Sequence, residues 1–155
     1  MRALLIALFC LVLTPLPALA QGDPVIGVSD SDAKMNAAMD QAAASLPAFL
    51  ANVTGPGGRS DQGAAVKVAM VDDYGGLEII WVAPFTWDGG TGFTGLLDNE
   101  PNALGDLRLG DEVRFSTDMV RDWSWADPAG PLWGNYTTRV LLPQMDERTQ
   151  TMLQQ

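Results

Sequence analysis

Apolar residues recur every three or four positions in the first part of the chain, after a polar run at residues 29–32 that supplies helix-capping side chains. The recurring positions are Met35, Ala38, Met39, Ala42 and Leu46. This spacing is typical of one face of an amphipathic helix and predicts a helix over about residues 32–46. Proline is disfavoured inside a helix but suits a first helical turn. We therefore expect Pro47 to lie in the first turn of a second short helix that carries Phe49, Leu50 and Val53.

From Ala64 onward the pattern changes to the alternation of a half-buried strand. Apolar residues alternate with smaller or polar ones up to a glycine-containing turn at 72–76, and branched and aromatic residues resume over 77–83. This arrangement predicts a β-hairpin. Turns rich in glycine, proline and aspartate separate further predicted strands over residues 93–97, 112–116, 119–125 and 132–142. The tail from residue 145 fits either a short helix or a frayed end.

Together these elements predict a single α+β domain. One N-terminal helix, or two, should pack on a strongly curved antiparallel sheet of five or six short strands. Glycine within or beside short strands often marks a tight bend. Partial closure into an SH3-like barrel is therefore among the forms expected for this sheet.

Residues 1–20 have the composition of a secretory signal peptide. Arg2 precedes an apolar run over residues 3–13, and two prolines break that run before an Ala-Leu-Ala site that ends at Ala20. A basic start, a short apolar core and a small-x-small site predict cleavage after Ala20. The run is shorter than the roughly 20 apolar residues of a membrane span. We therefore expect residues 21–155 to work as one domain in the periplasm or outside the cell, without stable membrane insertion.

The chain is acidic, with nine basic and nineteen acidic residues and a formal net charge of −10. Nucleic acids and anionic lipid surfaces are bound through Lys and Arg, so this balance argues against both as partners. It favours a soluble protein whose partners are neutral or cationic.

Two residue types that carry much of enzyme chemistry are missing from the predicted mature chain. Histidine is absent, and the single cysteine, Cys10, lies in the predicted signal peptide. Disulfides, zinc or copper sites of the His/Cys kind, Ser-His-Asp triads and cysteine nucleophiles are thereby excluded. Catalysis would have to rest on carboxylates, Lys67, tyrosines or hydroxyls, and we expect no cofactor. The acidic residues between 98 and 111 match no EF-hand spacing, so no metal is predicted.

Charged side chains within the predicted strands are candidates for paired or catalytic positions. Lys67 and Glu78 fall on the two strands of the hairpin, although the loop length leaves their register open. Burial would lower the pKa of Lys67 and make it reactive, and a facing carboxylate would oppose that shift. We favour ion pairing for Lys67, because paired charges are common in sheets. Asp122 precedes Trp123 among apolar neighbours, and a pair with Arg139 is its favoured structural role. The catalytic alternative makes Glu78 and Asp122 the acid/base pair of a glycoside hydrolase.

A set of residues spread over positions 32–142 occurs in one recognisable order. These residues are Lys67, Glu78, Trp81, Gly95, Leu97, Asn99, Pro101, Gly110, Asp111, Val113, Asp122, Trp123, Gly134, Tyr136, Thr137 and Arg139. In this order the chain resembles the YegJ-like bacterial family of domains of unknown function (domain of unknown function 2314). The resemblance implies a single compact domain, and the family has no established activity to carry over to these residues.

The aromatic residues are the strongest indication of a binding surface. Five tryptophans are more than a small curved sheet needs to bury. We expect Trp81 and Trp123 to pack in the core, and Trp87 and Trp133, which flank turns, to be exposed. Exposed aromatic residues rimmed by acids suit the binding of a peptide, a glycan or an envelope protein. The alternative is that all of them pack in the core or against turns.

The sequence therefore favours a binding module without enzymatic activity. Its candidate binding residues are Lys67, Trp81, Trp87, Asn99, Asp122, Trp123, Trp133 and Arg139. One alternative is a carboxylate-dependent hydrolase that uses Glu78 and Asp122. Another is an inhibitor or immunity-type protein whose acidic surface masks a cationic site.

Overall fold

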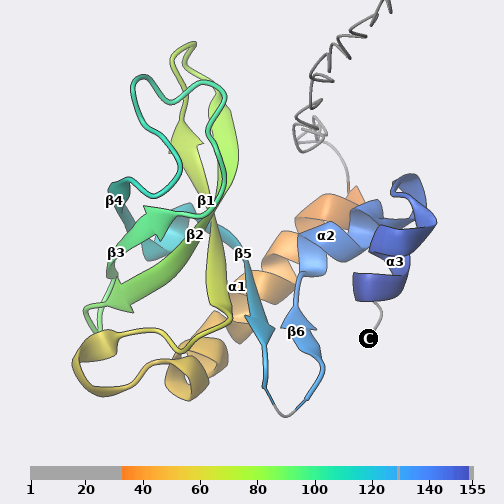
Figure 1. Cartoon of the computed structure of the whole chain (residues 1–155), viewed down its shortest axis with the longest axis horizontal. Helices are drawn as coiled ribbons and strands as arrows, with labels where there is room; N and C mark the ends of the chain where they lie inside the picture. The colour runs from red at the N-terminus through yellow and green to blue at the C-terminus, as the bar shows by residue number, and fades with distance from the viewer. Residues whose placement is uncertain (1–32, 129, 154–155) are drawn as a thin grey trace, which may run out of the picture.

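The computed structural model of the chain describes residues 33–128 and 130–153. Within them a long helix comes first, the strands of one sheet follow, and short helices come last (Figure 1). The α+β class predicted from the sequence is therefore confirmed. The predicted signal peptide and the polar run at residues 29–32 lie outside the described residues.

The first helix, α1 (Ala33–Val53), continues through Pro47, so the second helix that we expected this proline to open is part of α1. Pro47 lies on the exposed side of α1, and so does Ala43, whose carbonyl group loses its helical donor. Water can satisfy that carbonyl group. The buried stripe runs unbroken past the proline and comprises Met35, Ala38, Ala42, Leu46, Phe49, Leu50 and Val53. Packing of this stripe on the sheet keeps the helix in one piece.

Six antiparallel strands form one sheet in the order β4-β3-β2-β1-β5-β6. They are β1 (Ala64–Val71), β2 (Leu77–Trp87), β3 (Gly92–Leu97), β4 (Glu112–Ser116), β5 (Val120–Ala126) and β6 (Leu132–Gly134). The sheet is open, with β4 and β6 at its two ends, so the partly closed SH3-like barrel is not formed. Closure would need pairing between these outer strands, and β6 is only three residues long.

The strand expected over residues 132–142 ends at Gly134. Gly134 and Asn135 have positive φ angles, of 74° and 57°, which break an extended strand. A short helix, α2 (Tyr136–Leu141), follows directly, and α3 (Glu147–Leu153) occupies the tail for which the sequence left a helix or a frayed end open. The part of the chain that the structure describes also contains three 3₁₀ turns, η1 (Pro56–Gly58), η2 (Thr117–Met119) and η3 (Leu142–Gln144).

One face of the sheet packs on α1, which runs across it with α2 beside the N-terminal half of the helix (Figure 1). Val66 of β1 lies between Val82 and Trp123 in the strand register, and all three are buried on this face. The indole ring of Trp123 stacks on Phe49 with 4.5 Å between ring centroids, and its N–H donates to the carbonyl oxygen of Ala42 at 3.2 Å. Trp123 thus joins helix and sheet at the centre of the core.

The opposite face of the two central strands points away from α1, because side chains alternate between the two faces of a sheet. We call it the open face. It comprises Ala65, Lys67 and Val71 of β1 with Leu77, Ile79, Trp81 and Ala83 of β2. Ala69 of β1 and Asp122 of β5 point to the same side of the sheet but are buried.

Candidate functional site

Lys67 lies at the centre of the open face, in a row of three side chains from neighbouring strands. The strand register places it opposite Trp81 of β2 on one side and opposite Asp122 of β5 on the other. Directly opposed residues of antiparallel strands point to the same face of the sheet. Three of the residues singled out in the sequence are therefore brought together.

The ammonium group of Lys67 is enclosed by the start of α2 and by an aromatic ring. It donates to the hydroxyl oxygen of Thr137 at 3.0 Å and to that of Thr138 at 3.1 Å, and lies 4.6 Å from the centroid of the Trp81 ring. Burial lowers the pKa of Lys67, and the negative charge of Asp122 opposes that shift. A cation over an indole face is stabilised by the ring quadrupole.

Asp122 is fully buried, and its carboxylate caps α2 from the neighbouring strand. It accepts the backbone N–H groups of Trp123, Tyr136 and Thr137 at 2.8, 3.2 and 2.8 Å, and the Thr137 hydroxyl at 2.6 Å. Acceptors at a helix start satisfy N–H groups that have no partner within the helix. These donors take the place of the Asp122–Arg139 pair that the sequence favoured, because Arg139 donates to the carbonyl oxygens of Gly134 and Leu132.

The hydroxyl group of Thr137 links the charges of Lys67 and Asp122. It accepts from Lys67 and donates to Asp122, so the lysine and the carboxylate are joined through one hydroxyl. The arrangement fastens α2 to the sheet and leaves the carboxylate enclosed by donors. Lys67, Thr137 and Asp122 thus form a polar cluster that holds α2 against the sheet, and we call this cluster the polar support.

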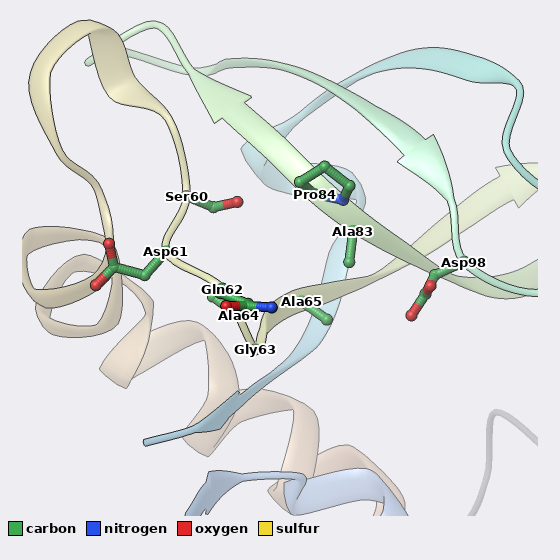
Figure 2. Close-up of a pocket in the computed structure, with 9 residues that line it drawn as sticks. All are labelled: Ser60, Asp61, Gln62, Gly63, Ala64, Ala65, Ala83, Pro84 and Asp98. Carbon is green, nitrogen blue, oxygen red and sulfur yellow. The ribbon is translucent and has the colours of Figure 1, made fainter. Parts of the chain in front are cut away.

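A groove of about 520 Å³ lies beside this support, along the same two strands. It is lined by Ser60, Asp61, Gln62, Gly63, Ala64, Ala65, Ala83, Pro84 and Asp98. Ala65 and Ala83 each lie two positions from Lys67 and Trp81 and therefore share their face. Their small side chains lie between Asp98 on one side and residues 60–62 on the other (Figure 2).

Asp98, one of the two acids that line the groove, is tied to Trp81 by a backbone hydrogen bond. Its N–H donates to the carbonyl oxygen of Trp81 at 2.9 Å, which fixes the residue at the end of β3. Partial burial raises the pKa of Asp98. Among the described residues its carboxyl group has no hydrogen-bond or ion-pair partner.

A second, smaller hollow of about 220 Å³ adjoins the groove and shares Ser60 and Pro84 with it. Its lining extends across β3 to Leu96 and to Glu112 of β4, which oppose each other in the strand register. The depression thus continues over the face of the sheet toward β4.

At the other end of the open face, the β1–β2 hairpin carries uncovered apolar side chains. Val71 and Leu77 oppose each other and are 71% and 56% exposed, and the next residue on that face of β2, Ile79, is 46% exposed. Tyr74 in the turn is also exposed. The hairpin extends away from α1, beside the loop that follows β3 (Figure 1). Clustered apolar exposure of this kind is typical of an interaction surface.

Glu78 and Asp122 lie on opposite faces of the sheet. Glu78 opposes Met70 in the strand register, three positions along β2 from Trp81. An odd number of positions puts its side chain on the other face of the sheet. Its carboxylate accepts the N–H groups of Asn102 and Ala103, both at 2.8 Å, and so holds the loop after β3. The structure does not bring together the two carboxylates of the hydrolase alternative.

The remaining predicted residues are dispersed. Asn99 accepts the backbone N–H of Trp81 at 2.9 Å and so supports the open face from the β3 end. Trp123 is in the core, as expected, whereas Trp81, which we also expected there, is only partly buried on the open face. Trp87 is partly buried, and its indole N–H closes the following turn by donating to Gly90 at 2.9 Å. Trp133 is 49% exposed, as expected, but lies on the edge strand β6, two strands from β1.

Sequence reasoning missed the hydroxyl groups of Thr137 and Thr138 and the groove itself. The threonines were assigned to a strand, where their side chains would have pointed to opposite faces. The groove had a usable signal, because Ala65 and Ala83 place small residues on the same face as the bulky Trp81.

Within the described residues, no group of three or more acidic, histidine or cysteine side chains is arranged to hold a metal ion. None of the described helices is long and apolar enough to cross a membrane. The fold and its open face define a small α+β domain whose most distinctive surface is one sheet face.

Comparison with known protein families shows which family the chain belongs to. Residues 32–155 match the family described as "Uncharacterized protein conserved in bacteria (DUF2314)", and the chain belongs to this family. No curated protein and no solved structure matches the chain.

Proposed function

We propose that the chain is a binding domain without enzymatic activity, acting in the periplasm or outside the cell, whose open face receives a segment of polypeptide. One observation carries the proposal. A groove at one end of the face and uncovered aliphatic side chains at the other end lie on the same two strands, with Trp81 between them. The signal-like segment at residues 1–20 supports the compartment.

A polypeptide suits this face better than a glycan. The uncovered side chains, Val71, Leu77 and Ile79, are aliphatic, and aliphatic contacts are formed best by apolar side chains of a partner. The Trp81 ring already carries the Lys67 ammonium group on one side. A free aromatic platform, which sugar rings favour, is therefore reduced to the other side of this ring.

The polar groups of the site favour binding over catalysis. Asp122 is enclosed by its donors, and Glu78 is on the other face and engaged with loop N–H groups. A general acid or base must reach the proton that it transfers. Lys67 is directed at two hydroxyl oxygens and a ring. These contacts support a structural role for all three.

A peptide-display selection tests the proposal. The purified chain is panned against random peptides of about twelve residues, and the enriched peptides are measured by calorimetry. The double variant Ala65→Leu/Ala83→Leu fills the groove, and Ile79→Ser removes apolar surface, so each should weaken binding at least about tenfold. Trp133→Ala, on the edge strand β6, is the matched control and should leave affinity unchanged. Failure to enrich any peptide, or equal affinity for the groove-filled variant, would overturn the proposal.

A further inference from the structure

We propose that the occupant of the open face is an extended, cationic amphipathic segment, with basic side chains near its ends and apolar side chains between them. This inference deepens the proposed function and rests on it. It follows from where the face carries charge and where it does not.

The groove end of the face is acidic. Both ionisable residues of its lining, Asp61 and Asp98, are acids. Asp98 is exposed at the edge of the groove, and its carboxyl group has no hydrogen-bond or ion-pair partner among the described residues. A basic side chain of the ligand can therefore pair with it through a charge-assisted hydrogen bond. The groove has a volume of about 520 Å³, and the small side chains of Ala65 and Ala83 lie in its lining (Figure 2).

The hairpin end of the face combines apolar side chains with acids. Asp72 and Asp73 follow Val71 directly in the turn, and both carboxylates take part in holding it. Asp72 accepts the N–H groups of Tyr74 and Gly76, and Asp73 accepts that of Gly105. Uncovered aliphatic side chains beside fixed negative charges complement an apolar stretch that ends in a basic residue.

Lys67 sets the pattern between the two ends. Its ammonium group is enclosed by α2 and the Trp81 ring and is joined to Asp122 through the Thr137 hydroxyl, so the middle of the face offers no free acceptor for a ligand cation. The ligand should therefore be uncharged where it passes Lys67 and Trp81. About six residues of strand separate Ala65 from Val71, which is roughly 20 Å, and an extended segment of about seven to nine residues spans that distance.

Other occupants fit this pattern less well. A second copy of the chain would bring another net charge of −10 against the same acids. An anionic lipid surface would be repelled in the same way. A neutral apolar segment would cover the aliphatic side chains but leave Asp98 without a partner.

Three labelled peptides of about ten residues provide the test, identical in an alternating valine–threonine centre and ending in lysine, glutamine or glutamate. Fluorescence anisotropy should give the tightest binding for the lysine-ended peptide, weakened about tenfold between about 50 and about 300 mM salt. Asp98→Asn should weaken that binding at least about fivefold. Asp40→Asn, an exposed acid on α1, is the control and should leave it unchanged. Circular dichroism establishes that both variants are folded.

The outcomes separate this inference from the proposed function. Equal affinity for the glutamine-ended peptide, or no effect of Asp98→Asn, would assign the face to a neutral apolar segment and overturn the inference while the proposed function stands. Binding of none of the three peptides would also overturn it, and the display selection then decides the proposed function by itself. Self-association that Ile79→Ser abolishes would assign the face to a second copy and overturn the inference.

Discussion

The carboxylate of Asp122 accepts both the backbone N–H and the hydroxyl group of Thr137, at 2.8 and 2.6 Å, although the two residues belong to different elements. A helix is usually capped by the residue just before it. Here that residue, Asn135, has a left-handed backbone, and its side chain donates to Ser124 instead. The cap of α2 is therefore supplied by β5, and the position of the helix depends on a single buried carboxylate.

Replacing Asp122 with asparagine should destabilise the fold strongly. The amide keeps one oxygen but turns an NH₂ group toward the N–H donors of α2, so buried donors lose their acceptor. We expect the free energy of unfolding to fall by roughly 2–4 kcal/mol in urea titrations. Asp40→Asn, on the exposed side of α1, should change it by less than about 0.5 kcal/mol. A loss of similar size in both variants would contradict the capping role.

Gly134→Ala should cost far more than Gly75→Ala, although both glycines have positive φ angles, of 74° and 81°. Both substitutions carry the left-handed backbone penalty of about 1–2 kcal/mol. At Gly134 a Cβ atom would also clash with the carbonyl oxygen of Trp123, whereas at Gly75 it would meet open space. We expect a loss of about 3 kcal/mol or more at Gly134 in thermal unfolding. Equal losses would mean that the chain relaxes easily around β6.

Trp123→Ala should lower the free energy of unfolding much more than Trp133→Ala, because Trp123 is buried and Trp133 is half-exposed. Trp123 is buried between Phe49 and Tyr136, with 4.5 and 5.6 Å between ring centroids. Deleting it should cost about 3–5 kcal/mol. Trp133 is half-exposed on an edge strand and should cost less than about 1 kcal/mol. Chemical denaturation followed by circular dichroism compares the two, and a large loss at Trp133 would be incompatible with its exposure.

Lys67 should make stability depend on alkaline pH. Its pKa in the folded chain is lowered by burial from the usual 10.5, so between the lowered value and 10.5 the unfolded chain binds more protons. The free energy of unfolding therefore rises with pH across that window, and this gain is lost again as the pH falls through the lowered pKa. Urea titrations at about pH 8 and about pH 10 should show wild type gaining stability relative to Lys67→Met. A constant difference would show that the fold does not disfavour the charged amine.

Asp98→Asn should raise the melting temperature slightly while it weakens ligand binding. The pKa of Asp98 is raised by partial burial, which means that the fold disfavours the carboxylate form. Removing that charge should raise the free energy of unfolding. The gain should stay below about 1 kcal/mol, because the side chain is largely exposed. Opposed effects on stability and function are common at binding sites. A lowered melting temperature in differential scanning calorimetry would mean that Asp98 supports the fold.

The class of fold was predictable because its elements depend on local patterns. The buried stripe from Met35 to Val53 and the alternation after Ala64 each repeat with the period of one element. The break after Gly134 was not predictable in this way. Residues 136–141 are as apolar and branched as a strand, and the helix forms there because Asp122, from a distant strand, accepts its first N–H groups.

The candidate site was predicted only in part, for a related reason. Lys67, Trp81 and Asp122 were singled out, but their meeting depends on a strand register that loop length does not determine. The same register separates Glu78 from Asp122 by placing them on opposite faces. Asp98 joins the groove where β3 ends beside β2, and this tertiary contact leaves no signal in the segment around Asp98. Only the small residues Ala65 and Ala83 gave the groove a signal in the sequence.

The open strand order described above also bears on how the protein avoids aggregation. An open sheet has two edges, and unpaired backbone groups on an edge can pair with a strand of another molecule. One edge here is β6, with three residues, and the other is β4, whose exposed Glu112 and Arg114 place charges along five residues. Short and charged edges discourage such pairing. The fold can therefore leave the aliphatic side chains of the β1–β2 hairpin exposed and still resist growing into larger sheets.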